Sequence, residues 1–284
     1  MGLTKLSDYY RPKKLTEAIR LLKENDGYFP IGGGTWLIPY GGPEVRGIVD
    51  LSEAGIREIR LEETLMYIGA STTLNDLLTA PETSSHPYGF IRETINSEGS
   101  TRLIDSVSTV GGKIALGRGD SSFLAGLTAI DATIILFGKM SEDIKLWDYL
   151  NNSELRKENH IISGIEISTP ENLHSVIFES ISYIRSSPPL ISLALYLTLS
   201  GNLIDSVRIV FSSIEEKLVR LEEAETMLLG KELDDELIKK VSALAAKTIE
   251  PSYDPKGSAE YKKAMAGLLI ERALTEINSN RGVS

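Results

Sequence analysis

Three consecutive glycines follow a short apolar run in the stretch PIGGGTW, from Pro30 to Trp36. Glycine loses more conformational freedom on folding than any other residue, so three in a row indicate a backbone that must approach another group closely or turn sharply. A second glycine-rich stretch, TVGGKIALGRG, runs from Thr109 to Gly119. The fold of this chain must therefore accommodate two segments in which the backbone itself makes the important contacts.

The first glycine stretch does not fit the common phosphate-binding fingerprints. In G-x-G-x-x-G the third glycine position is occupied by Leu37, and the prolines and glycines between residues 39 and 43 argue against the helix that this motif requires. No Gly-Lys-Ser/Thr sequence follows, which argues against a Walker loop.

Another geometry is compatible with both stretches. Successive backbone N–H groups in a tight turn can form an anion-binding nest without a helix, and the hydroxyls of Thr35 and Thr109 can add donors. We expect the second stretch to be a loop that closes over the same anion. On spacing alone, two tight turns without a ligand remain the alternative interpretation.

Hydrophobic periodicity predicts mixed α and β structure in the first part of the chain. Thr73, followed by Asp76, fits a helix start with an N-cap and an acid three residues later. The predicted helices span residues 15–24 and 121–130, a further helix starts at Thr73, and the predicted strands span residues 28–31, 47–51, 65–70, 132–137 and 161–167.

From about residue 175, the sequence pattern predicts a β-hairpin backed by helices. The turn residues Ser200, Gly201 and Asn202 separate two apolar runs, although the first run alone is also compatible with a helix. Helical patterns cover about residues 219–229, 234–248 and 257–277.

Composition excludes several classes of function. The 284 residues include no cysteine, so thiolate catalysis and iron–sulfur ligation by this chain are excluded. The three histidines have no metal-binding spacing. A formal net charge of −10 argues against a nucleic-acid partner. No apolar run is long enough to span a membrane and no signal peptide is visible, so we expect a cytoplasmic protein.

Several stretches resemble the FAD-binding medium subunit of the molybdenum hydroxylases, the xanthine, carbon monoxide and aldehyde dehydrogenases. PIGGGTWLIP and TVGG look like the two glycine loops of that family, and YYRPKKLTEAIRLL fits its opening. The tail follows in order with SGNLIDSVRIVFSSI, RLEEAETMLLGKEL and GSAEYKKAM. The resemblance implies an α+β fold. By this resemblance, two α/β subdomains, at about residues 1–55 and 56–172, would form a PCMH-type FAD-binding domain, and residues 173–284 would form a small antiparallel sheet with a helical bundle.

The resemblance also implies a function. FAD would receive electrons from a [2Fe–2S] small subunit, which is supplied by a molybdopterin-binding large subunit, and would pass them to an external acceptor. No catalytic side chain and no metal ligand are expected, because the chemistry belongs to the cofactor. The residues expected at the cofactor are Ile31, Gly32, Gly33, Gly34, Thr35, Trp36, Thr109, Gly111, Gly112, Lys113, Asp120 and Ser122. Trp36 stacks on the cofactor or serves as a core or lid residue.

The chain departs from the family pattern at the expected cofactor site. Asp105 replaces an arginine before the second stretch, and Lys113 replaces an asparagine after it. The family's later aspartate falls on Ser122, with Asp120 two residues earlier, and its Arg-x-x-x-Asp becomes Arg185 to Pro189. We expect Lys113 and Arg118 to offset the charge of Asp105. The alternative is a structural subunit that no longer holds flavin firmly.

Overall fold

The computed structural model describes residues 3–138, 143–157, 160–170, 172–184, 187–251 and 257–280. The chain forms two compact units that interleave along the sequence. The first unit comprises Met1–Glu82, Thr101–Leu116 and Asp131–Ser168, and the second comprises Thr83–Ser100, Gly117–Ile130 and Thr169–Ser284.

A small parallel sheet opens the first unit, in the order β1-β3-β2. Its strands are β1 (Asp8–Tyr10), β2 (Tyr28–Ile31) and β3 (Gly47–Asp50). Helix α1 (Leu15–Glu24) buries Ala18, Ile19 and Leu22 and contacts β2 and β3, so its apolar stripe faces this sheet. The chain leaves β2 directly into the first glycine stretch.

A five-stranded antiparallel sheet completes the first unit, in the order β4-β5-β8-β6-β7. The strands are β4 (Ile59–Glu62), β5 (Leu65–Gly69), β6 (Thr133–Phe137), β7 (Asp143–Lys145) and β8 (Ile161–Ser168). The short helices of this unit are α2 (Leu37–Tyr40), α3 (Leu74–Thr79), α5 (Arg102–Asp105), α6 (Val110–Leu116), α8 (Leu146–Asn151) and α9 (Ser153–Lys157), with a 3-10 turn at Leu51–Glu53. Helix α6 contacts β5 and β8, which places the second glycine stretch against this sheet.

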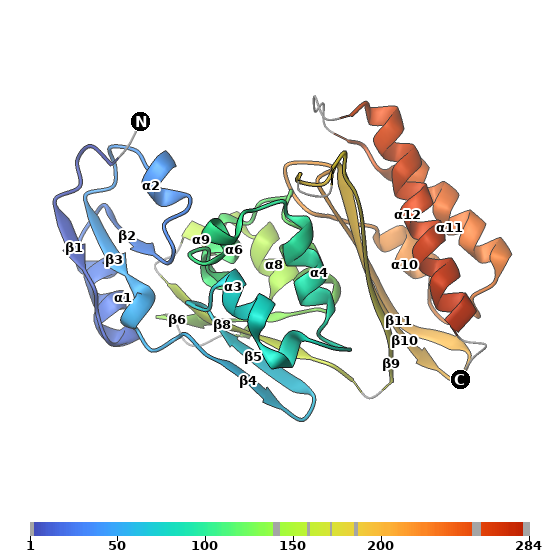
Figure 1. Cartoon of the computed structure of the whole chain (residues 1–284), viewed down its shortest axis with the longest axis horizontal. Coiled ribbons are helices and arrows are strands. Elements are labelled where there is room, and N and C mark those ends of the chain that lie inside the picture. The colour runs from blue at the N-terminus through green and yellow to red at the C-terminus, as the bar shows by residue number, and fades with distance from the viewer. Residues whose placement is uncertain are drawn as a thin grey trace. The chain divides into compact units, whose positions relative to one another are not determined.

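The second unit is built on an antiparallel sheet in the order β12-β11-β10-β9. The strands are β9 (Leu173–Ile181), β10 (Ile191–Ser200), β11 (Leu203–Ser212) and β12 (Val219–Arg220). Helices α10 (Glu222–Leu228), α11 (Asp235–Thr248) and α12 (Ala259–Asn280) pack with this sheet into one apolar core (Figure 1). The predicted hairpin is confirmed, and the apolar run before the turn is strand β10.

Two helices from the first half of the sequence belong to the second unit. Helix α4 (Phe90–Ser97) contacts β9, and α7 (Ser122–Ala129) contacts β10 and β11. Every residue of α7 is buried. Odd-numbered residues of β10 join the core with α10–α12, whereas Ser192 on the other face hydrogen-bonds Ser122 of α7. Strand β10 is therefore covered on both faces, which explains its continuous apolar run.

The elements confirm most sequence predictions and correct three. The helix predicted over about residues 219–229 begins only at Glu222, because Val219 and Arg220 pair with β11 as strand β12. Helices at residues 15–24, 121–130 and 234–248, the five predicted strands of the first part and the helix start at Thr73 are confirmed, with ends that shift by a residue or so. The prolines near residue 39 do not prevent α2, a four-residue helix that ends at Gly41. The second glycine stretch is not a loop throughout, because residues 110–116 form α6. Within the described part of the chain, no helix has the length and apolarity needed to cross a lipid bilayer.

Candidate functional site

The two glycine stretches lie against each other in the first unit. A Cβ atom added to Gly33 would overlap the carbonyl group of Val107, and one added to Gly32 would overlap the hydroxyl of Thr109. The hydroxyls of Ser108 and Thr35 are 3.5 Å apart across the same contact. The glycines after β2 therefore permit a close approach of backbone to backbone, at residues 107–109.

Three backbone amides of the first stretch are available to a ligand. Among the described residues, none accepts a hydrogen bond from the N–H groups of Gly33, Gly34 or Thr35, and all three residues are half-buried. Gly34 has a φ of +69°, the left-handed conformation that turns successive N–H groups toward one side. A half-buried amide without an acceptor is costly unless water or a ligand accepts from it, so this turn is suited to an anion.

The second stretch offers a hydroxyl in place of backbone amides. Val110 N–H donates to Thr72 O at 3.0 Å, and Gly111 N–H donates to Ala70 O at 2.8 Å. Gly112 N–H donates to Thr109 Oγ1 at 3.1 Å, at the start of α6. The expectation of free amides here is therefore corrected. The hydroxyl of Thr109 accepts one bond and keeps its proton for another acceptor.

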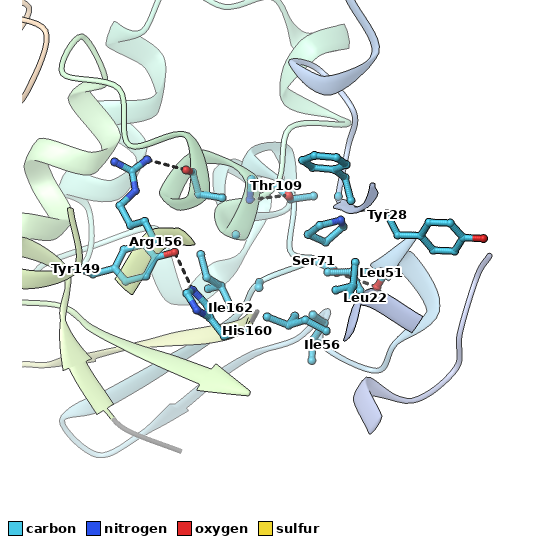
Figure 2. Close-up of a pocket in the computed structure, with 18 of the residues that line it drawn as sticks. Leu22, Tyr28, Leu51, Ile56, Ser71, Thr109, Tyr149, Arg156, His160 and Ile162 are labelled. Atoms are coloured by element: carbon cyan, nitrogen blue, oxygen red, sulfur yellow. Dashed lines mark hydrogen bonds between the residues drawn. The ribbon is translucent and has the colours of Figure 1, made fainter. Parts of the chain in front are cut away.

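A cavity of about 410 Å³ opens beside these residues, within the first unit (Figure 2). Its walls come from α1, β2, the start of α6 and the segment around β8. The lining residues are Leu22, Asn25, Asp26, Gly27, Tyr28, Phe29, Pro30, Gly32, Leu51, Ile56, Ala70, Ser71, Thr109, Gly111, Gly112, Ala115, Tyr149, Arg156, His160, Ile161 and Ile162. Figure 2 shows Leu22, Leu51 and Ile56 on one side of the view and Tyr149, Arg156 and His160 on the other.

The polar side of the cavity was not predicted from the sequence. Tyr149 Oη and His160 Nε2 are 3.0 Å apart, and Arg156 Nη2 donates to Ala115 O at 2.8 Å and Leu116 O at 3.0 Å. Burial raises the pKa of the Tyr149 phenol, while the charge of Arg156 acts in the opposite direction. These residues come from α8, α9 and the position just before β8, and no short motif connects them in the sequence.

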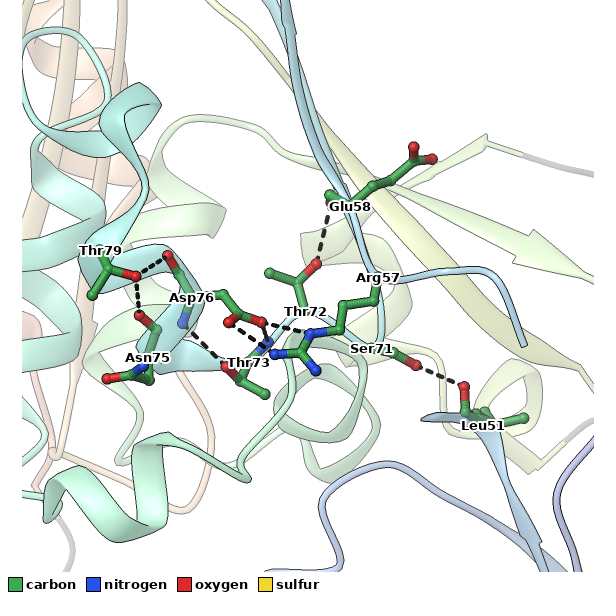
Figure 3. A network of polar contacts seen from close by, with 9 residues as sticks. All are labelled: Leu51, Arg57, Glu58, Ser71, Thr72, Thr73, Asn75, Asp76 and Thr79. Atoms are coloured by element: carbon green, nitrogen blue, oxygen red, sulfur yellow. Dashed lines mark hydrogen bonds and ion pairs between the residues drawn. The ribbon is translucent and has the colours of Figure 1, made fainter. Parts of the chain in front are cut away.

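A hydrogen-bond network fixes the cavity wall that follows β5 (Figure 3). Ser71, a lining residue, donates from Oγ to Leu51 O at 3.0 Å, and Thr72 donates from Oγ1 to Glu58 O at 3.2 Å. Thr73 and Asp76 form a reciprocal capping box at the start of α3. Arg57 donates to both carboxylate oxygens of Asp76, at 2.9 and 3.0 Å.

Other residues predicted at the cofactor have different surroundings. Ile31 is buried in the core of the parallel sheet, and Trp36 is 41% exposed beside Tyr40, with ring centroids 6.0 Å apart. Lys113 is half-buried in α6 and is not among the cavity-lining residues. Asp105 is 5% exposed, so its carboxylate does not face solvent.

Two of the predicted residues lie in the second unit. Asp120 is exposed and forms an ion pair with Arg118, with 2.6 Å between Nη2 and Oδ2. Ser122 is fully buried and its hydroxyl lies 3.1 Å from that of Ser192, so it has a packing role in this unit. Arg185, at the position of a further departure, lies outside the described residues.

The donors of the first unit fit a dinucleotide such as FAD. A diphosphate needs several hydrogen-bond donors, which the amides of Gly33, Gly34 and Thr35 and the hydroxyl of Thr109 supply. Flat heteroaromatic rings need apolar walls, which the cavity provides beside polar groups. Among the described residues, no group of three or more His, Asp or Glu side chains is placed to bind a metal ion.

Comparisons with known proteins agree with this geometry. Residues 4–170 match the family model of the FAD binding domain in molybdopterin dehydrogenase, and residues 187–277 match the CO dehydrogenase flavoprotein C-terminal domain. The glyceraldehyde dehydrogenase medium chain of Sulfolobus acidocaldarius is 26% identical over 278 residues, which cover 95% of this chain and 97% of the relative. The carbon monoxide dehydrogenase medium chain of Afipia carboxidovorans is 29% identical over 281 residues, which cover 94% and 95%.

Solved structures show the same fold. The Cu,Mo-CO dehydrogenase has a chain that superimposes with a TM-score of 0.80 at 26% identity, covering 94% of this chain and 96% of that one. The matched family model covers more than half of the chain, and its members bind FAD. The predicted fold and cofactor are thereby confirmed. The chain belongs to the FAD-binding medium subunits of the molybdenum hydroxylases, and it is an oxidoreductase subunit.

Proposed function

We propose that this chain passes electrons through FAD from a [2Fe–2S] partner subunit to an external acceptor, in a complex that also contains a molybdopterin-binding large subunit. The chain has no cysteine, so the ligands of an iron–sulfur cluster must come from another polypeptide. The family match supports a subunit of a larger complex.

The observation that carries the proposal is the row of three amides that have no acceptor among the residues that the structure describes. The N–H groups of Gly33, Gly34 and Thr35 would donate to the diphosphate of FAD, and the hydroxyl of Thr109 would add a fourth donor. Gly32 would allow Thr109 to lie this close, and Gly111 would let α6 approach Ala70, where an added Cβ would lie 2.8 Å from the Ala70 Cβ. Asp120 remains a prediction from the family resemblance. Ser122 is not proposed as a cofactor-binding residue, because its hydroxyl is buried beside that of Ser192.

The protein's part in the reaction is to bind and orient. FAD, when bound, supplies the redox chemistry, and the residues around it fix its position and exclude water. The apolar cavity side, formed by Leu22, Leu51 and Ile56, would shield one end of the dinucleotide from solvent. No side chain of this chain is required to hold or move a proton.

Reconstitution with FAD tests the proposal. The purified chain is titrated with FAD, and binding is followed by the flavin absorption spectrum and by quenching of flavin fluorescence. We expect saturable binding of one FAD, and we expect the reduced [2Fe–2S] partner to bleach the flavin absorbance of the bound form. A folded chain that takes up no flavin would favour the structural-subunit alternative instead.

A further inference from the structure

A group of exposed apolar side chains lies beside the three amides of the first glycine stretch. Six large apolar side chains are exposed on two short segments of the first unit, one around α2 and one around α5. The most exposed of them are Leu103 at 77% and Tyr40 at 68%. We call this group the apolar patch, and its members are Trp36, Ile38, Tyr40, Leu103, Ile104 and Val107.

The two segments that carry the patch are in direct contact. A Cβ atom on Gly33 would overlap the carbonyl of Val107, and the hydroxyls of Thr35 and Ser108 are 3.5 Å apart. The six side chains are therefore gathered in one region of the first unit. Single exposed apolar side chains are ordinary on a protein surface, whereas a group on touching segments marks an interaction site.

The patch carries little charge although the chain is acidic. Residues 32–43 contain no aspartate, glutamate, lysine or arginine. In residues 101–108 the charged side chains are Arg102, which is exposed, and Asp105, which is buried. Glu44 supplies the exposed carboxylate that comes next in the sequence. The exposed charge of the two segments is thus positive, in a chain with a formal net charge of −10.

An iron–sulfur subunit fits this surface in charge, in permanence and in position. A [2Fe–2S] cluster held by four thiolates is anionic, which favours a surface without exposed carboxylates. Permanent subunit interfaces are more apolar than those of partners that bind and leave, such as an external electron acceptor. The patch begins one residue after the amide of Thr35, so a subunit docked on it lies next to the FAD of the proposed function.

We infer that the apolar patch is the docking surface for the [2Fe–2S] subunit that supplies electrons to the flavin. This inference rests on the proposed function. Leu103 and Tyr40 form the apolar centre of the interface, and Arg102 lies at its charged edge.

Because the chain has no cysteine, a single introduced thiol is a specific probe of this surface. Leu103→Cys places the thiol in the patch. Leu61→Cys is the matched control, because Leu61 lies on β4 of the same unit and is 43% exposed. The rate of maleimide labelling is measured in the isolated chain, in the isolated chain with saturating FAD and in the assembled complex. Ser106→Cys, at the exposed edge of the patch, carries a photo-reactive crosslinker that is attached before assembly.

We expect labelling of Leu103→Cys to be at least about tenfold slower in the complex than in the isolated chain, and FAD alone should not change it. Leu61→Cys should label at the same rate in all three samples. The crosslink from Ser106→Cys, identified by mass spectrometry, should lead to the cysteine-rich subunit. Leu103→Glu should lower the ratio of iron to flavin in the recovered complex without changing the dissociation constant of FAD, because the new charge meets the partner and not the cofactor.

Several outcomes overturn the inference. Labelling of Leu103→Cys that is as fast in the complex as in the isolated chain does so. Protection by FAD alone assigns the patch to the cofactor, and a crosslink to the large subunit or to a second copy of this chain assigns it to that partner. A chain that is recovered without any partner subunit also overturns it.

Failure of the proposed function has a separate readout. A folded chain that takes up no flavin contradicts the proposed function, whereas labelling and crosslinking still decide whether the iron–sulfur subunit covers the patch.

Discussion

The triple glycine after β2 is explained by a neighbouring piece of backbone. The carbonyl of Val107 occupies the position where a side chain of Gly33 would begin, and the left-handed φ of Gly34 turns the chain away from the sheet. The sequence indicated a close approach at this point. It did not indicate that part of that approach is made by residues 107–109, because such a contact joins positions more than 70 residues apart.

Gly33→Ala should loosen this contact. The new Cβ overlaps a carbonyl that belongs to the backbone, so the two segments must separate, and we expect a loss of about 1–3 kcal/mol in the free energy of unfolding together with weaker FAD binding. Gly89→Ala is the control, because its φ is −56° and an added Cβ there comes no closer than 3.5 Å to its neighbours. Denaturant unfolding and FAD titration of both variants measure the difference. Normal FAD affinity in Gly33→Ala would show that the turn tolerates displacement.

Thr109 has two roles that its variants should separate. Its Oγ1 accepts from Gly112 N–H and so caps α6, and its proton is the proposed donor to the diphosphate. Thr109→Val should cost about 1 kcal/mol of stability through the lost cap and should weaken FAD binding about tenfold, whereas Thr109→Ser should preserve both properties. Thermal unfolding and the FAD dissociation constant are the measurements. Equal FAD affinity in the valine and serine variants would remove Thr109 from the proposed site.

The carboxylate of Asp76 stabilises helix α3 through two interactions. Asp76 accepts from the backbone N–H of Thr73 and pairs with Arg57 across the network of Figure 3. Burial on its own would raise the pKa of Asp76, but the hydrogen bonds from Arg57 and Thr73 outweigh it and the net pKa is lowered. Because the folded state favours the charged form, the stabilisation is present above the unfolded pKa and is lost as the pH falls through the folded pKa.

Asp76→Asn should therefore lower stability at pH 7 but not in acid. We expect a loss of about 1 kcal/mol at pH 7, which shrinks as the pH falls through the folded pKa of Asp76, because the wild-type carboxylate then becomes protonated as well. Arg57→Gln should show a smaller loss over the same pH range, since it removes one partner and leaves the capping box. Urea unfolding at a series of pH values measures these curves, and a loss independent of pH would contradict the assignment.

Local patterns predicted the elements whose signals are local. The capping box at Thr73, the stripe of α1 and the turn between β10 and β11 all follow from residues a few positions apart. Helix α6 was not foreseen, because glycines disfavour helices; its start is fixed by Thr109 and by bonds from Val110 and Gly111 to distant carbonyls. The polar side of the cavity was not predicted for a different reason. Tyr149, Arg156 and His160 form no recognisable sequence motif, and they line one cavity only in the folded chain.

The chain belongs to a family of subunits of larger complexes, so we expect it to be isolated together with partner subunits. An affinity tag on this chain, used in the native organism under mild conditions, should recover a cysteine-rich small subunit and a large molybdopterin subunit. Iron, molybdenum and flavin analysis of the recovered complex is the measurement. An active oxidase that consists of this chain alone would contradict the proposed division of labour.

Because the two units interleave along the sequence, a single cut in the chain separates parts of the second unit that pack together. Helices α4 and α7 come from the first half of the sequence but pack on the sheet formed by β9, β10 and β11. In α7, Phe123, Leu124 and Leu127 have no exposed surface, and the hydroxyls of Ser122, Ser192 and Ser212 form a buried chain with spacings of 3.1 and 2.5 Å. A cut at residue 172 would therefore expose a packed apolar helix on one fragment and a sheet face on the other.

Residues 1–172 expressed alone should bind hydrophobic dyes and aggregate, and co-expression with residues 173–284 should restore a soluble pair. The reason is that burying the side chains of α7 contributes several kcal/mol, which neither fragment retains by itself.

In the uncut chain, Phe123→Ala should cost about 3–5 kcal/mol, whereas Tyr183→Ala, at a side chain that is 71% exposed, should cost little. Size-exclusion chromatography and denaturant unfolding provide the test. A monomeric 1–172 fragment that unfolds cooperatively would show that α7 finds other contacts, and the two units would then not be the folding units of this chain.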